Sequence, residues 1–275
     1  MASALATIDA WPRPHAAAVL VEGEIVDDRG DVEVELPWAS VTKVATALAT
    51  HVAVAGGYLR LDDAAGPPGS TVRHLLAHAS GLAFDRAEVR AAPGARRIYS
   101  NAGYEVLAGV VATAVGRPFA AWLEESVLAP LGMGRSRLVG SAAAGLLGPL
   151  ADLVGLAEEL QRPSLLPAPS AALLRDVAFP GLAGLLPGLG HQVANDWALG
   201  PEVRDHKAPH WTGARNDPST FGHFGASGSF IWVDPAAGVA CACATGAPFG
   251  DWARAAWPAL ADAVLAEWSS GTGPS

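Results

Sequence analysis

The segment that decides the fold is "PWASVTKVATALATH", residues 37–51, which begins with a proline and continues as an apolar, alanine-rich run. It places Ser40 and Lys43 three residues apart. In a helix, residues at this spacing share one face, with roughly 5–6 Å between their Cβ atoms. Ser40 therefore has two interpretations: it caps a buried helix, or it is a nucleophile whose base lies one turn further along.

The chemistry of a serine nucleophile sets conditions on its neighbours. A serine hydroxyl attacks poorly until a base is held within hydrogen-bond reach. If the helix begins at Ser40, the unpaired N–H of Ser40 and the positive end of the helix dipole also face a developing oxyanion. Lys43 can be the base only while it is neutral, which requires burial or polar neighbours that lower its pKa. The tetrapeptide alone also fits a capped helix with a surface lysine, so it does not decide the matter.

A second motif lies in "RRIYSNAGYEVLAG", residues 96–109, at a loop-to-helix junction. Ser100 or Asn101 fits a helix N-cap there, and Tyr99 fits a packed ring with a free hydroxyl. Beside Lys43, however, Tyr99 would have its pKa lowered from roughly 10 and would pass a proton between nucleophile and leaving group. Asn101 would then bind the substrate amide or orient the lysine.

A third motif is "FGHFGASGSFIWV", residues 221–233, in which three glycines leave the backbone of a strand bare. Glycine inside a strand often marks the close approach of a ligand, although a bulge or bend is the competing explanation. In the functional interpretation His223 contacts a substrate oxygen. The N–H of Ala226 then serves as an oxyanion donor beside that of Ser40.

Composition excludes several classes of function. Hydrophobic residues make up 51% of the 275 residues, which is enough for a substantial core. Charged residues make up only 16%, with a net charge of -9, so we expect binding neither to nucleic acid nor to anionic membranes. The first 15 residues lack the basic start of an export signal, which predicts a cytoplasmic protein. Apolar runs are too short for a membrane-spanning helix.

No motif for a metal or a cofactor is found. The sequence contains no H-E-x-x-H, P-loop, G-x-S-x-G or dinucleotide-binding glycine motif. Cys241 and Cys243 alternate along an expected strand, so we predict two buried free thiols. His74 and His78 are four apart on an expected helix, but no carboxylate is placed to join them. We expect a small-molecule acyl substrate as the only partner; the oligomeric state is left open.

Periodicity and turn signals outline the elements. A hairpin is expected at residues 16–27, with its turn at Glu22-Gly23, and a second strand pair flanks Asp234-Pro235. A first helix is expected from Ser40 to the glycines at 56 and 57, and a second over residues 70–81, where Gly81 ends it. Further helices are expected over residues 101–116, 117–133, 150–160 and 170–177. The last helix is expected over residues 251–268 and is interrupted or restarted at Pro258.

This order predicts an α/β (α+β) fold. Both termini contribute to one antiparallel sheet flanked by helices, formed by residues 1–59 and 190–275. Residues 60–189 form an inserted, all-helical subdomain. A cleft between the two parts is the natural place for a site.

The three motifs together, "SVTK" at 40–43, "YSN" at 99–101 and "GHFG" at 222–225, resemble the serine β-lactamase and penicillin-binding-protein superfamily. The resemblance is strongest to the branch with class C β-lactamases, D-amino-acid peptidases and related esterases. It extends to "STVRHLLAHASGL", similar to the family's LLTHTSGL, to the stretch ending in "PLGM", and to "LPGLGHQV". Three motifs in the right order are far more specific than one.

The resemblance implies a role for each motif residue. Ser40 would be the acylated nucleophile, Lys43 its proton acceptor and Tyr99 the base that assists acylation and deacylation. Asn101 would bind the substrate amide. The N–H groups of Ser40 and Ala226 would form the oxyanion hole.

The third motif departs from the family pattern. His223, Phe224 and Gly225 stand where the family usually has K-T-G, and a lysine there would offer a permanent charge to a substrate carboxylate. His223 is largely neutral near pH 7 unless its pKa is shifted, and Phe224 adds an apolar wall. Both changes favour neutral or hydrophobic acyl substrates. If His223 must be charged to hold an anionic substrate, that activity should fall as pH rises through its pKa.

The sequence therefore predicts a β-lactamase-family serine hydrolase that cleaves an ester or amide bond, with β-lactams as slow substrates or inhibitors. It would work through an acyl-Ser40 intermediate without metal or nucleotide. Two alternatives share the fold, a D-amino-acid peptidase and a transacylase. A third, from another class, is an inactive binding pseudoenzyme.

Overall fold

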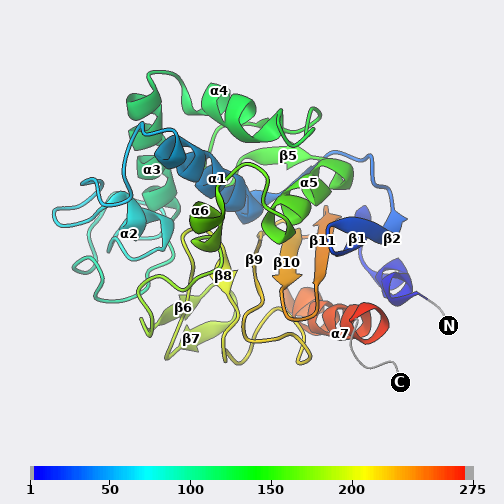
Figure 1. The fold of residues 1–275 in the computed structure, drawn as a ribbon. Coiled ribbons are helices and arrows are strands. Elements are labelled where there is room, and N and C mark those ends of the chain that lie inside the picture. The colour runs from blue at the N-terminus through cyan, green and yellow to red at the C-terminus, as the bar shows by residue number, and fades with distance from the viewer. Residues whose placement is uncertain (1–2, 270–275) are drawn as a thin grey trace.

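A six-stranded antiparallel sheet forms the centre of the molecule (Figure 1), as seen in the computed structural model, which describes residues 3–269. In spatial order the strands are β2 (Glu24–Gly30), β1 (His15–Val21), β11 (Val239–Thr245), β10 (Phe230–Asp234), β9 (Phe221–Phe224) and β8 (Glu202–Val203). Because β1 pairs with β11, the N-terminal and C-terminal parts of the chain meet inside one sheet, which confirms the predicted architecture.

The central strands β1 and β11 are buried on both faces. Along β11 the alternation of residues sends Ala240 and Ala242 to one hydrophobic cluster, and Cys241 and Cys243 to the other. Small side chains on these strands let helices pack closely on either side. The two thiols are free and fully buried, as predicted, and burial raises the pKa of each.

Helices cover the two faces of this sheet. The 3-10 helix η1 (Ala4–Ala10) and α7 (Asp251–Trp268) lie on the face that carries the cysteines, while α1 (Thr42–Ala55) and α5 (Leu150–Gln161) lie on the other (Figure 1). The expected break at Pro258 is wrong, because α7 runs through it as one helix. Buried residues on both sides of the proline, Trp257 and Leu260 among them, hold the helix against the sheet.

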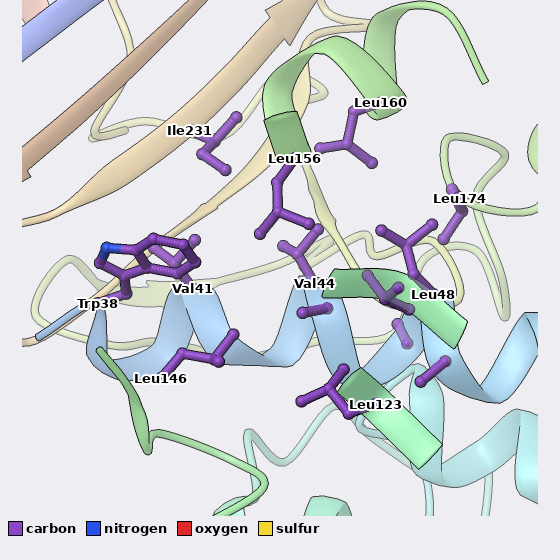
Figure 2. Close-up of a cluster of buried hydrophobic side chains, with 14 of the residues drawn as sticks. Trp38, Val41, Val44, Leu48, Leu123, Leu146, Leu156, Leu160, Leu174 and Ile231 are labelled. Atoms are coloured by element: carbon purple, nitrogen blue, oxygen red, sulfur yellow. The ribbon is translucent and has the colours of Figure 1, made fainter. Parts of the chain in front are cut away.

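Helix α1 is buried along almost its whole length, which explains its apolar sequence. It lies between the sheet and the remaining helices, so that side chains from α4, β5, α5 and β10 surround it (Figure 2). The residues of this cluster that Figure 2 labels are Trp38, Val41, Val44, Leu48, Leu123, Leu146, Leu156, Leu160, Leu174 and Ile231. Such packing fixes the position of the residues at the start of the helix.

The inserted part carries the remaining helices, with some differences from expectation. They are α2 (Val72–Leu76), α3 (Asn101–Val115), α4 (Phe119–Leu123) with the π-helical turn η3 (Glu124–Leu128), and α6 (Ala168–Ala172). Helix α2 ends at Leu76 and not near Gly81, because His78 has a φ of 55°. Helix α6 is earlier and shorter than residues 170–177.

The insertion is also not purely helical. It contains the short strands β4 (Arg137–Leu138), β5 (Leu146–Gly148) and β6 (Gly184–Leu186), which pair respectively with β5, with β3 (Leu36–Pro37) and with β7 (Gly190–Gln192). Helix α5 packs on the sheet although the proposed boundaries assign it to the helical subdomain. The boundaries themselves stay a prediction.

Within residues 3–269 no single helix is both long and apolar enough to cross a membrane. Helix α3 and the segment Phe119–Leu128 meet the length and composition requirement only when taken together, and they are bent by 79° relative to each other.

Candidate active site

Ser40 and Lys43 lie in direct contact at the start of α1. Ser40 belongs to the 3-10 turn η2 (Ala39–Val41) that runs directly into α1 at Thr42, so the expected helix start near Ser40 is confirmed, with a first turn that is 3-10 and not α-helical. The turn preserves the shared face, and Lys43 Nζ is 3.1 Å from Ser40 Oγ. Ser40 is partly exposed, whereas Lys43 is fully buried.

The surroundings of Lys43 fit a neutral amine. Nζ lies 2.6 Å from Asn101 Oδ1 and 2.9 Å from the Ala143 carbonyl oxygen, and both of these atoms can only accept hydrogen bonds. A neutral amine has two N–H groups for these acceptors and a lone pair left for the Ser40 hydroxyl. Burial lowers the pKa of Lys43 to about 7, against the opposing charge of Glu105. The amine can therefore take the serine proton near neutral pH.

Tyr99 lies beside this pair, within a group of aromatic rings. Its ring centroid is 4.5 Å from that of His78, 5.6 Å from Trp197 and 5.9 Å from His223, and Lys43 Nζ lies 4.7 Å from the centroid of the Tyr99 ring. The expected lowering of the tyrosine pKa is wrong. Burial among the rings raises it, and a hydrogen bond with Ser40 opposes this only in part.

The correction follows from desolvation, which raises the pKa of Tyr99 more than the Ser40 hydrogen bond lowers it. Tyr99 is therefore a neutral phenol at pH 7, with its ring partly exposed toward the site.

Asn101 is the first residue of α3, and Ser100 caps the helix by accepting a hydrogen bond from the Gly103 N–H. The helix start directs the Asn101 amide oxygen to Lys43. Of the two roles considered for Asn101, the structure contains the contact that orients the lysine; the contact with a substrate amide stays a prediction.

His223, on β9, is neutral. Its Nδ1 lies 2.7 Å from the Phe224 carbonyl oxygen, which can only accept, so Nδ1 carries the proton and Nε2 is an acceptor. Within the described residues Nε2 is buried and meets no hydrogen-bond partner. Burial, followed by the proximity of Lys43, lowers the pKa of His223 to about 3. Above a pH of about 3 His223 is therefore uncharged, which argues against its holding an anionic substrate through a positive charge.

Gly225 brings the end of β9 against the nucleophile turn. A Cβ atom on Gly225 would overlap the Trp38 carbonyl oxygen and lie 3.1 Å from Ser40 N. In the turn η2, the first residue whose N–H donates to a backbone carbonyl is Val41, and its acceptor is the Trp38 carbonyl oxygen. Among the described residues, the N–H of Ser40, one residue earlier, is not used in this way. Both Ser40 and Ala226 line the same cavity. This arrangement fits the proposed pair of oxyanion donors, whose role stays a prediction.

A cavity of about 240 Å³ opens in front of Ser40. Its walls are mostly apolar, and the side chains that bring polar atoms are those of Ser40, Tyr99, His223 and Glu202 together with the indole N–H of Trp197. The apolar lining consists of Phe84, Leu186, Pro187, Gly188, Trp197, Phe224, Ala226 and Phe249. The predicted apolar wall at Phe224 is therefore present, and Leu186, Pro187 and Gly188 come from the "LPGLGHQV" segment. Phe84, Trp197 and Phe249 come from segments in which the sequence gave no functional signal.

Glu202 is the largest omission of the sequence analysis. Its carboxylate is buried and accepts from Lys207 Nζ at 2.6 Å, from Trp211 Nε1 at 2.6 Å and from His210 Nε2 at 3.0 Å. Burial alone would raise the pKa of Glu202, but the contacts with His210 and Lys207 outweigh it and lower the pKa to about 2. The only signal in the sequence is an acidic residue at the start of a short strand, which is too common to be diagnostic.

Arg97 was also not anticipated. It is buried, and its guanidinium donates to the backbone carbonyls of Ala77, Ala178, Phe179 and Asn195. These bonds connect the loop that carries Tyr99 to three other loops around the cavity. Desolvation lowers the pKa of Arg97 to about 10, so it stays a cation at neutral pH.

In the described part of the chain, no three His, Cys, Asp or Glu side chains group closely enough to hold a metal ion.

An antiparallel sheet with a helical insertion, and a serine in contact with a buried lysine beside a cavity, define the class of serine hydrolases that includes β-lactamases and penicillin-binding proteins. Comparison with known proteins agrees. The Beta-lactamase family model matches residues 16–265. The chain belongs to the β-lactamase family of serine hydrolases.

Individual relatives give the same assignment. A β-lactamase from Mycobacterium bovis has a crystal structure that matches with a TM-score of 0.95 and 50% sequence identity, over 97% of this chain and 100% of that one. EstCE1, described as a hydrolase with promiscuous acyltransferase activity, matches with a TM-score of 0.77 and 18% identity, over 95% and 96% of the two chains. At that identity the likeness concerns the fold alone.

A curated relative matches over a short stretch. The D-alanyl-D-alanine-carboxypeptidase/endopeptidase AmpH of Escherichia coli (strain K12) is 43% identical over 47 residues. These residues make up 17% of this chain and 12% of AmpH, so the match spans only a small part of that protein's length.

Proposed function

We propose that this protein hydrolyses small, uncharged esters, and more slowly amides, through an acyl-Ser40 intermediate. The observation that carries the proposal is the contact of 3.1 Å between Ser40 Oγ and the Nζ of a fully buried lysine. A lysine with a pKa near 7 is matched to general-base work at neutral pH.

In the acylation step Lys43 takes the hydroxyl proton while Ser40 Oγ forms a bond to the substrate carbonyl carbon. The N–H groups of Ser40 and Ala226 stabilise the oxyanion. When the carbon–oxygen bond to the leaving group breaks, the Tyr99 hydroxyl gives its proton to the departing alkoxide and regains one from Lys43. The raised pKa of Tyr99 keeps its hydroxyl protonated at neutral pH, so the proton is present for this transfer.

Deacylation uses the same groups in reverse. A water molecule loses a proton to neutral Lys43 through the Tyr99 hydroxyl and attacks the acyl carbon. Collapse of the oxyanion breaks the bond to Ser40 Oγ, which recovers its proton, and the acid leaves. Asn101 and the Ala143 carbonyl keep the amine directed at Oγ throughout.

The charge of the cavity supports an uncharged substrate. The lining residues that the structure describes include the carboxylate of Glu202 but no Lys or Arg side chain. Lys207 is buried and paired with Glu202, and His223 is neutral. A substrate carboxylate, as found on penicillins and on peptides with a free C-terminus, would therefore enter without a partner, which is costly in an apolar cavity.

A direct test is to label the protein with an alkyl fluorophosphonate and locate the adduct by mass spectrometry. Ser40 Oγ would displace fluoride from phosphorus, and we expect the added mass on the peptide that contains Ser40. Ser40→Ala should abolish both this adduct and the hydrolysis of p-nitrophenyl esters. Labelling that persists in Ser40→Ala would refute the proposal.

A transacylase is a second candidate, favoured by the apolar cavity. An apolar wall can hold an alcohol acceptor in place of water. Product analysis with added short-chain alcohols separates the two activities: new ester in excess over free acid would indicate transfer. An acyl-enzyme that forms but never turns over would instead indicate the inactive binding protein.

A further inference from the structure

Two segments far apart in the sequence meet at one wall of the cavity. One is the turn between β6 and β7, in which the Leu189 N–H donates to the Leu186 carbonyl at 2.9 Å across Pro187 and Gly188. The φ of Gly188 is 72°, and proline followed by a glycine of positive φ is the pattern of a type II turn. The other segment is the loop between β11 and α7, which carries Phe249.

The absence of a side chain at Gly188 is what allows Phe249 its position. A Cβ atom on Gly188 would lie 2.6 Å from Phe249 Cε1, so the edge of the ring sits directly against the turn. Leu186, Pro187 and Gly188 of the turn line the cavity in front of Ser40, and so does Phe249. The β6–β7 turn and the Phe249 ring therefore together close this side of the cavity.

The Phe249 ring is held firmly on its other sides. Its centroid is 4.9 Å from the Phe224 ring and 5.0 Å from the Trp257 ring. The Phe249 N–H donates to the Ala226 carbonyl at 3.0 Å, which ties its backbone to a proposed oxyanion donor. Because the ring cannot retreat without disturbing Phe224 or Trp257, it acts as a fixed wall.

We infer that Phe249, seated against Gly188, limits the length of the substrate chain that fits beside Ser40; this inference rests on the proposed function. The cavity of about 240 Å³ is below the roughly 300–1,000 Å³ of pockets for drug-sized ligands. Apolar walls and small volume select short, unbranched chains. Phe249 is partly exposed, and beyond its ring lies Arg254 at 5.8 Å, so loss of the ring opens the cavity toward the surface.

The test compares p-nitrophenyl acetate, butyrate and octanoate on the whole protein and on Phe249→Ala. We expect the unaltered protein to prefer the short esters. In Phe249→Ala the ratio of kcat/KM for octanoate over acetate should rise by about tenfold or more, the effect typical of removing or adding a methylene-sized barrier in an apolar pocket. Phe249→Leu should give an intermediate ratio, and it covers the case in which the alanine variant folds poorly.

A matched control is Tyr58→Ala. Tyr58 is also an aromatic residue about half exposed, packed on Trp122 beyond the end of α1 and absent from the cavity lining. Tyr58→Ala should leave the ratio of kcat/KM for octanoate over acetate unchanged.

Fluorophosphonate labelling distinguishes a failure of the proposed length limit from a failure of the proposed function. If Ser40 is labelled and short esters are cleaved, but the Phe249 variants keep the chain-length profile of the unaltered protein, the length limit is overturned and the proposed function stands. If no adduct forms on Ser40 in any of these proteins, both are overturned.

Discussion

Lys43 sets the pH range in which the site can work. Burial lowers the pKa of its amine to about 7, and only the neutral amine accepts the serine proton. We therefore expect kcat/KM for an uncharged ester to rise with pH through about 7 and then stay level. The pKa of His223 is about 3 and that of Tyr99 is raised, so neither should add a second limb between pH 5 and 9.

The pH–rate profile of Glu105→Gln supplies the control for this assignment. Glu105 is the charge that opposes the fall of the Lys43 pKa, so its removal should move the midpoint of the profile to lower pH. A midpoint that stays in place, or a profile flat through pH 7, would contradict the role given to the amine.

Lys43 should also make folding stability depend on pH. The folded protein releases the lysine proton near pH 7, whereas the unfolded chain holds it until about 10.5. Between these values the unfolded state binds one more proton, so the free energy of unfolding rises with pH by about 1.4 kcal/mol per unit. Lys43→Met lacks this contribution.

Denaturant titrations measure the difference. From pH 7, where half of the Lys43 amine is already neutral, to pH 9 the unaltered protein should gain about 2 kcal/mol relative to Lys43→Met, which should be inactive at both values. Equal pH dependence of the two proteins would show that the lysine stays charged when folded.

Single residues also show where sequence reasoning succeeds. The spacing of Ser40 and Lys43 is a local property of a helix, so their contact could be predicted. The protonation state of Tyr99 could not, since it depends on His78, Trp197 and His223, which come from three other segments. The place of Glu202 in the cavity wall could not be predicted either, because it also depends on residues from other segments.

At the scale of elements, the junction between the end of β9 and the turn η2 leaves no room for a side chain at Gly225. Gly225→Ala would place a methyl group onto the Trp38 carbonyl and next to Ser40 N. We expect a loss of about 1–3 kcal/mol in stability from overpacking. Displacement of the nucleophile should lower kcat about 10²-fold.

Gly109→Ala is the matched control, since Gly109 lies in the middle of α3 with nothing within 4 Å of an added Cβ. It should leave activity unchanged and raise stability by about 1 kcal/mol through helix propensity. Thermal unfolding and ester hydrolysis of both variants provide the comparison. If Gly225→Ala behaved like Gly109→Ala, the close approach would not matter for function.

Elements with a regular period were predictable, and those decided by contacts were not. The strand pair around Asp234-Pro235 and helix α3 follow from alternation and end signals. The early end of α2 depends on the positive φ of His78, whose Nδ1 accepts from the Ser100 N–H. The continuity of α7 through Pro258 depends on packing against the sheet. Neither feature can be predicted from the neighbouring residues in the sequence.

For the molecule as a whole, the arrangement of both termini in one sheet was predictable because strand signals occur at the two ends of the chain and helix signals between them. The shape of the cavity was not, because its wall combines β6, β8, β9 and the loop before α7. Side chains from distant segments determine its charge and size, and only the three-dimensional structure brings them together.

The same burial that keeps the site neutral should make the whole molecule sensitive to acid. Burial lowers the pKa of His51 to about 4, that of His223 to about 3, and that of His78 well below its usual value. Below the ordinary histidine pKa of about 6.5, the unfolded chain binds protons that the folded protein does not, so stability falls as pH decreases. Three such groups together should cost about 4 kcal/mol per pH unit, a large part of a typical total stability.

We therefore expect the denaturant midpoint to drop steeply between pH 6.5 and 5. Glu202 does not contribute in this window, because its pKa of about 2 means that its stabilising effect is lost only at much lower pH. His51→Gln removes one of the three groups while leaving the site intact, since His51 lies on α1 with Nε2 bonded to the Leu199 carbonyl at 2.9 Å. This variant should lose stability with falling pH less steeply than the unaltered protein, by up to about 1.4 kcal/mol per pH unit. A midpoint that is constant over the window would mean that these histidines titrate normally in the folded protein, and that the interior around Ser40 is wetter than its apolar walls imply.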